Sequence, residues 1–147
     1  IGDEKQAFVH YLDLGLYFNA FDEFVKRMNP NTDAKGIYKH IKPGPILEKE
    51  GRIENVLTPG QMIIVQIVKE PISTKGSRLT AEISLAGRNI VLLPFAEKVS
   101  VSQKISSKEE KRRLETLVKS ILPRNYGAII RTAAEGKNAA VLDAEVM

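Results

Sequence analysis

An arginine and a threonine, Arg131 and Thr132, follow a short apolar stretch at residues 126–130 and precede a glycine-containing turn at residues 133–137. A guanidinium can hold a phosphate through two parallel hydrogen bonds, and a hydroxyl with nearby backbone N–H groups can complete the contacts. The pair is therefore a candidate anion site. Without further context, a surface arginine at the end of a strand is the simpler interpretation.

A second candidate lies in residues 61–95, which predict three strands joined by two glycine-containing breaks. The first break carries Lys75 at its tip, and Arg78 opens the segment that follows. That segment alternates between apolar and polar residues up to Leu85, as expected of a strand with one face in water. A basic residue beside a lysine loop would suit a polyanion, but an ordinary soluble hairpin would look the same.

Residues 6–11 predict a short strand that places Phe8 and His10 on one face. An aromatic ring on an exposed strand can stack on an unpaired base. Packing of Phe8 into a core is the simpler alternative.

The sequence offers no catalytic residues and no metal site of its own. It contains two histidines in unrelated positions, His10 and His40, and no cysteine. The metal-binding and nucleophile motifs are absent, and the acidic residues are scattered. No pair of carboxylates suggests acid–base or two-metal chemistry, and we expect no cofactor to be bound by these residues.

The composition is that of a folded protein with a mild basic excess. The 147 residues can bury one core or two small ones, and 43% of them are hydrophobic. The net charge of +4 leans toward a nucleic-acid partner, although solubility alone would explain it. No apolar run approaches the ~18 residues of a membrane span, and no signal peptide is visible, so we expect a cytoplasmic protein. Both ends resemble the interior of a domain, which suggests a piece of a longer chain.

The pattern of helices and strands predicts an α+β protein. Two amphipathic helices are expected, at residues 17–28 and from Ser106 or Ser107 to the residue before Pro123. Residues 29–51 read as a mobile loop or insertion. The remaining expected elements are a strand at 62–69 covered on both faces, strands at 99–105 and 126–132, and a helix from about Asn138.

Several segments, taken in order along the chain, resemble one family. They are Ala7–Tyr11, Val65–Glu70, Thr74-Lys75-Gly76, Leu79-Thr80, Ile83–Gly87, Val91–Pro94, Ile130–Ala133 and Gly136-Lys137. Each segment alone is weak evidence of a family, but the ordered set is specific. It spans nearly the whole chain apart from residues 29–51. The chain resembles the N-terminal half of the bacterial ribonuclease E/G family.

The resemblance implies two modules. Residues 1–84 would form an OB-type RNA-binding domain, truncated at its start and interrupted by the flexible insertion at about 29–51. Residues 85–147 would form a small mixed α/β subdomain, truncated at its end, that senses the five-prime end of RNA. An OB barrel has five strands, and only three candidates are visible here, so the fold expected is α+β with a partial barrel.

The resemblance also implies roles for individual residues and for the whole protein. Phe8, Lys75 and Arg78 would contact RNA, whereas Gly87, Val91, Arg131 and Thr132 would hold a terminal monophosphate. The longer protein would be a magnesium-dependent, single-strand-specific endoribonuclease of RNA processing, rRNA processing and decay, with its catalytic carboxylates outside these residues. It would form a homo-oligomer. The alternative is a non-catalytic OB-fold RNA-binding module acting in translation or RNA assembly, and a scaffold without a nucleic-acid partner is a third possibility.

Overall fold

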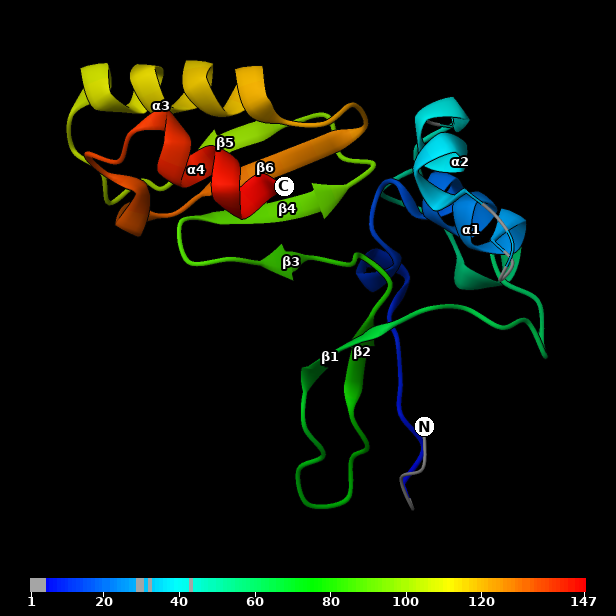
Figure 1. Ribbon diagram of the computed structural model, residues 1–147. Coiled ribbons are helices and arrows are strands. Elements are labelled where there is room, and N and C mark those ends of the chain that lie inside the picture. Colours follow the sequence, from blue (N-terminus) through cyan, green and yellow to red (C-terminus); the bar gives the residue numbers. More distant parts are fainter. Residues whose placement is uncertain (1–4, 29–30, 32, 43) are drawn as a thin grey trace. The chain divides into compact units, whose positions relative to one another are not determined.

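The computed structural model describes residues 5–28, 31, 33–42 and 44–147. The chain divides into two compact units, Ile1–Ile83 and Ser84–Met147. Four α-helices and two sheets occur within the described residues (Figure 1), which confirms the predicted α+β class. Each unit is described by itself below.

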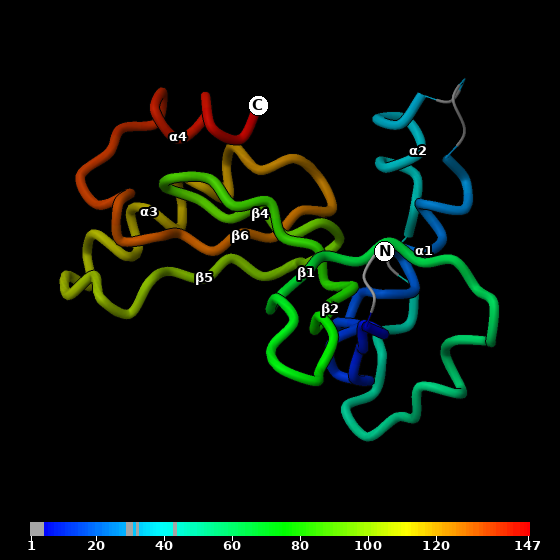
Figure 2. The backbone as a smooth tube through the Cα atoms, turned by 90° about the horizontal axis from the view of Figure 1, so that it is seen from below, coloured from blue at the N-terminus to red at the C-terminus, as the bar shows by residue number. Residues whose placement is uncertain are grey.

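The second unit is built on a sheet of four strands in the order β3-β4-β6-β5 (Figures 1 and 2). The strands are β3 (Leu85–Ala86), β4 (Ile90–Pro94), β5 (Val99–Val101) and β6 (Tyr126–Ile130). Neighbouring strands are antiparallel except β5 and β6, which run parallel because helix α3 (Lys108–Ile121) connects them. The carboxyl ends of β5 and β6 therefore lie at the same edge of the sheet.

Helices α3 and α4 (Ala139–Val146) supply the other side of this unit's core. Ile90, Ala128 and Ile130 project from one face of the sheet and pack with Leu114 and Val118 of α3 and Leu142 of α4. The residues between them, such as Val91 and Ile129, belong to the opposite face. Ile129 is 40% exposed there, so one face of the sheet is covered and the other borders solvent.

Two side-chain caps fix where these helices begin. The Ser107 hydroxyl accepts a hydrogen bond from the backbone N–H of Glu110 at 3.2 Å, and Asn138 caps α4 in the same way at 3.1 Å from the N–H of Val141. The Glu110 carboxylate itself accepts from Arg113 and from the N–H of Gly136. The hydrogen bonds from Arg113, and then from Gly136, lower the pKa of Glu110 to about 2. The predicted starts of both helices are confirmed.

The first unit is less regular. Its strands β1 (Gln66–Lys69) and β2 (Arg78–Thr80) form an antiparallel pair, and helix α1 (Phe18–Arg27) matches the helix expected at 17–28. Two short 3₁₀ turns complete it, η1 (Tyr11–Leu14) and η2 (Ile53–Asn55). Leu14, Phe18 and Ala81 form its core cluster. Among the residues described, the strands do not close into a barrel.

The expected central strand at 62–69 is wrong in both length and burial. Only Gln66–Lys69 is a strand, and all four residues are exposed. Met62 is 89% exposed and Ile67 is 55% exposed. An apolar run shows what a strand could bury, but burial needs a neighbouring element to cover it. In the described part of the chain, β2 is the only strand that pairs with β1.

Two further expectations about the first unit are corrected. Residues 6–11 do not form a strand: Phe8 makes a single bridge to Arg78, and the chain then enters η1. The predicted loop at 29–51 contains helix α2 (Ala34–His40), which contacts α1 through the edge-to-face rings of Phe24 and Tyr38 at 5.3 Å. Tertiary packing thus stabilises a short helix that the spacing of apolar residues in the sequence does not reveal. Residues 29, 30, 32 and 43 of the predicted loop lie outside the described residues.

Candidate functional site

A surface pocket of about 560 Å³ lies where β6 ends. Arg131 and Thr132, the candidate anion pair, both line it. Three polar residues from other segments also line it: Arg88 from the turn after β3, Ser102 from the end of β5, and Lys104 just beyond. The pocket therefore combines three cationic side chains with two hydroxyls.

Hydrogen bonds fix Arg131 and Thr132 within this pocket. The Arg131 guanidinium donates from Nη1 to the carbonyl oxygen of Gly87 at 2.8 Å, and the Arg131 backbone N–H donates to the carbonyl oxygen of Asn89 at 2.8 Å. The hydroxyls of Thr132 and Ser102 lie 3.0 Å apart, and Ser102 Oγ also accepts from the N–H of Lys104 at 3.3 Å. Only one guanidinium nitrogen is used in the bond to Gly87, so the fork keeps further donors for a ligand.

The four residues predicted to bind phosphate do not all line this pocket. Arg131 and Thr132 line the pocket, and Gly87 contributes a carbonyl oxygen that holds Arg131. Val91 is half-buried in β4, opposite Ile129 in the register, and does not line the pocket.

The site residues predicted from the sequence did not include Arg88, Ser102 or Lys104. The parallel pairing of β5 with β6 was the signal that could have found Ser102. In that register Val101 pairs with Ile130, so the residues that follow both strands emerge together at one edge.

The three residues predicted to contact RNA, Phe8, Lys75 and Arg78, line one surface pocket of the first unit, about 610 Å³ in volume. Lys75 sits in a tight turn in which Ile72 and Lys75 exchange backbone hydrogen bonds at 3.0 and 3.2 Å. The glycine after it is required by close packing, because a Cβ on Gly76 would overlap the carbonyl group of Gln6. The backbone that carries Lys75 is therefore held in place by hydrogen bonds and close packing.

Arg78 is already engaged. Its guanidinium donates two hydrogen bonds to the carboxylate of Asp13, at 2.9 and 3.1 Å. The hydrogen bond from Arg78 lowers the pKa of Asp13, and this effect outweighs the raising effect of burial. The backbone oxygen of Asp13 also accepts from Ala81 and from the Thr80 hydroxyl, each at 2.8 Å. Arg78 thus ties η1 to β2 as well as lining the pocket.

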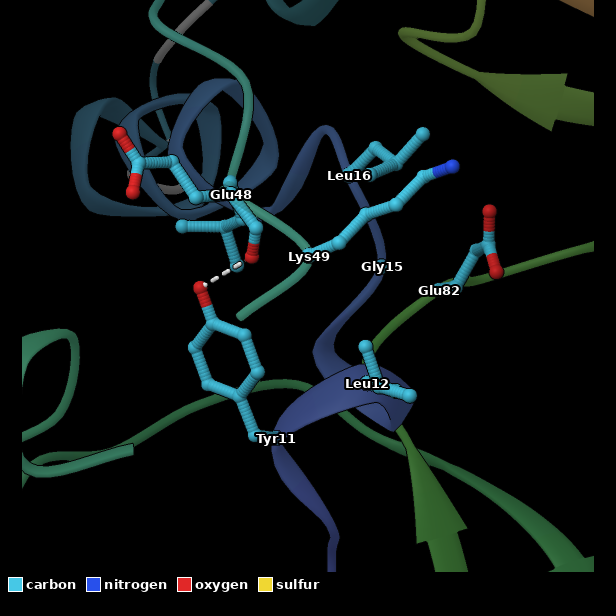
Figure 3. Close-up of a pocket in the computed structure, with 8 residues that line it drawn as sticks. Tyr11, Leu12, Gly15, Leu16, Glu48, Lys49 and Glu82 are labelled. Carbon is cyan, nitrogen blue, oxygen red and sulfur yellow. Dashed lines mark hydrogen bonds between the residues drawn. The ribbon is translucent and has the colours of Figure 1, made fainter. Parts of the chain in front are cut away.

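A third hollow in the first unit, of about 420 Å³, contains none of the predicted site residues (Figure 3). Leu12, Leu16 and Leu47 line it, together with Lys49 and Glu82. The Tyr11 hydroxyl donates to the carbonyl oxygen of Glu48 at 2.7 Å and holds that segment in place. The described residues contain no group of three or more histidine and acidic side chains that could hold a metal ion.

Residues 84–147, which form the second unit and contain the Arg131 pocket, match the Ribonuclease E/G family. The chain is 35% identical over 150 residues to a ribonuclease E of Nostoc sp., covering 100% of this chain and 18% of that protein. It is 38% identical over 136 residues to a ribonuclease G of Haemophilus influenzae, covering 92% and 24%. A ribonuclease G of Escherichia coli is 46% identical over 90 residues, covering 61% and 18%.

These similarities make the chain a relative of proteins named as ribonucleases. The chain belongs to the ribonuclease E/G family, as the ordered segments indicated. It spans between 18% and 24% of the length of the three relatives named above. Within the described residues, none of the helices is both long and apolar enough to cross a membrane.

Proposed function

We propose that this chain is the RNA-engaging portion of a single-strand-specific endoribonuclease, and that its second unit binds the monophosphate at the five-prime end of RNA. Arg131 carries the proposal. It is exposed, it lines a pocket with Arg88, Lys104 and Thr132, and it is held at both its main chain and its side chain. A preorganised guanidinium among hydroxyls and further cations suits a terminal phosphate better than an uncharged group.

The first unit would hold the single-stranded segment of the RNA. Phe8 supplies an aromatic face for a base, and Lys75 supplies a charge for the phosphate backbone from the same pocket. Arg78 would contribute less, because its Nε and Nη2 already donate to the carboxylate of Asp13.

In the whole protein we propose hydrolysis of RNA that depends on magnesium, assembly into a homo-oligomer and a place in cytoplasmic RNA processing. Magnesium needs oxygen ligands. No cluster in the described residues could supply them, so no step of cleavage is assigned to these side chains.

Replacing Arg131 with alanine tests the phosphate site. We expect Arg131→Ala to lower the preference for monophosphate over hydroxyl ends by about tenfold or more, since a hydrogen bond to a charged group contributes about 1.5–3 kcal/mol. The measurement is the affinity of two otherwise identical single-stranded RNAs that differ only in the group at the five-prime end.

Arg124→Ala is the matched control, because Arg124 is an exposed arginine of the same unit outside the pocket. It should leave the affinity for both RNAs, and therefore the ratio of the two affinities, unchanged. Unchanged discrimination in Arg131→Ala would reject the phosphate site. It would leave the alternative of an OB-fold RNA-binding module that engages RNA through the Phe8 and Lys75 pocket alone.

A further inference from the structure

The turn between β3 and β4 is held by a carboxylate from a different element. Glu145 of α4 accepts the backbone N–H of Asn89 at 2.8 Å and that of Ile90 at 3.3 Å. Its second oxygen accepts the side-chain amide of Asn89 at 2.7 Å. One carboxylate therefore fixes the backbone and a side chain of the same turn.

The same turn holds Arg131. The carbonyl oxygens of Gly87 and Asn89 accept the guanidinium and the backbone N–H of Arg131, each at 2.8 Å. Arg88, which lies between them, lines the pocket. Asn89 therefore links Glu145 to the backbone of Arg131, although Glu145 does not line the pocket itself.

Hydrogen bonds and close packing restrict the conformation of this turn. The N–H of Gly87 donates to the carbonyl oxygen of Ile90 at 2.8 Å, and a Cβ on Gly87 would overlap Glu145 Oε1 and lie 2.8 Å from that carbonyl oxygen. Asn89 is only 6% exposed. Its amide nitrogen is committed to Glu145, and its Oδ1 is buried without a hydrogen-bond partner in the described structure. Glu145 therefore accepts the backbone N–H groups of Asn89 and Ile90 and the side-chain amide of Asn89.

The acidity of Glu145 agrees with this role. Burial alone would raise its pKa, but the hydrogen bonds from Asn89 and its neighbours outweigh burial and lower the pKa. The carboxylate is consequently ionised near neutral pH and can act only as an acceptor, which matches the N–H groups that it faces.

We infer that Glu145 is a positioning residue of the phosphate pocket: by fixing the β3–β4 turn, it aligns Arg131 and Arg88 and so sets the preference for a terminal phosphate. The inference rests on the proposed function of the pocket. It adds that this specificity depends on α4, which is separate in sequence from the residues that touch the ligand.

Glu145→Gln tests the inference, since it keeps the shape of the side chain but replaces one acceptor oxygen with a donor. We expect the preference for monophosphate over hydroxyl ends to fall by about five- to tenfold, the effect of weakening one hydrogen bond to a charged group. Affinity for the hydroxyl-ended RNA should not change. The amide resonances of Asn89 and Ile90 should shift in the free protein, which reports the loosened turn directly.

Asp143→Asn is the matched control. It removes one negative charge from the same helix, and no hydrogen bond or ion pair of the Asp143 side chain is found among the described residues. It should leave the ratio of the two affinities unchanged. An equal loss of preference in Asp143→Asn would mean that helix charge, and not the turn, is responsible, and would overturn the inference.

Comparison with Arg131→Ala and one further variant keep the outcome decisive. If Arg131→Ala removes the preference but Glu145→Gln retains it, the inference fails and the proposed function stands; if neither variant has an effect, the proposed function fails. Should Glu145→Gln not fold, Gly87→Ala tests the same contact, because a Cβ on Gly87 would overlap the Glu145 carboxylate. Retained preference for the monophosphate end in Gly87→Ala would overturn the inference, whereas a loss of that preference with unchanged affinity for the hydroxyl-ended RNA would support it.

Discussion

Asp13 shows how one residue joins distant parts of the first unit. Its carboxylate binds the guanidinium of Arg78, and its carbonyl oxygen accepts from Thr80 and Ala81. The ion pair is partly exposed, with 38% of the Arg78 side chain and 16% of the Asp13 side chain accessible. Water therefore screens the charges, and the contribution of the pair lies in geometry more than in attraction.

Asp13→Asn should lower the free energy of unfolding near neutral pH by at most about 1 kcal/mol, as for other partly exposed ion pairs. The pKa of Asp13 lies below its usual 3.8 in the folded protein because Arg78 binds the charged form. The stabilisation is therefore present above pH ~4 and disappears as the pH falls through the folded pKa. Urea unfolding of both proteins across a pH series measures the difference.

Glu54→Gln provides the control for charge, because Glu54 is an exposed carboxylate of the same unit for which the described structure shows no ion pair. The free energy of unfolding of Glu54→Gln should equal that of the wild type at every pH. A stability gap between the wild type and Asp13→Asn that persists in acid would show that the carboxylate charge is not what stabilises the contact.

The elements differ in how far the sequence predicts them. Helix α3 can be predicted from the sequence because its cap, its apolar stripe and its terminating proline all lie within or next to the helix in the sequence. Strand β1 is not, because burial depends on a covering element that local periodicity does not report. The site divides in the same way. Arg131 and Thr132 are adjacent in sequence, whereas Ser102 joins them only through the parallel pairing of β5 with β6.

Ser107→Ala should lower the free energy of unfolding by about 1 kcal/mol, the usual cost of losing a helix cap. The reason is local: the N–H of Glu110 loses the hydroxyl that it donates to at 3.2 Å. Chemical denaturation with an unchanged slope and a shifted midpoint would measure it. Ser106→Ala should have little effect, because the structure gives the cap to Ser107 alone; equal effects from both would contradict the assigned cap.

At the scale of the whole molecule, the basic excess becomes informative only through its placement. A net charge of +4 fits a soluble scaffold as well as an RNA-binding protein. Yet each unit places cations in a surface pocket: Lys69, Lys75 and Arg78 in the first, and Arg88, Lys104 and Arg131 in the second. A cationic pocket in each unit favours a polyanionic partner, and a single-stranded nucleic acid has the required charge.

Affinity for single-stranded RNA should therefore fall as salt rises, because each phosphate contact releases a bound counterion. In a plot of the logarithm of the association constant against the logarithm of the salt concentration, each phosphate neutralised on a single strand should contribute about −0.7 to the slope. Lys75→Ala and Arg131→Ala should each make the slope shallower by roughly that amount if each side chain contacts one phosphate. Arg124→Ala, outside both pockets, should leave it unchanged. An affinity that is flat from low to moderate salt would contradict RNA binding through charge and would favour the scaffold interpretation.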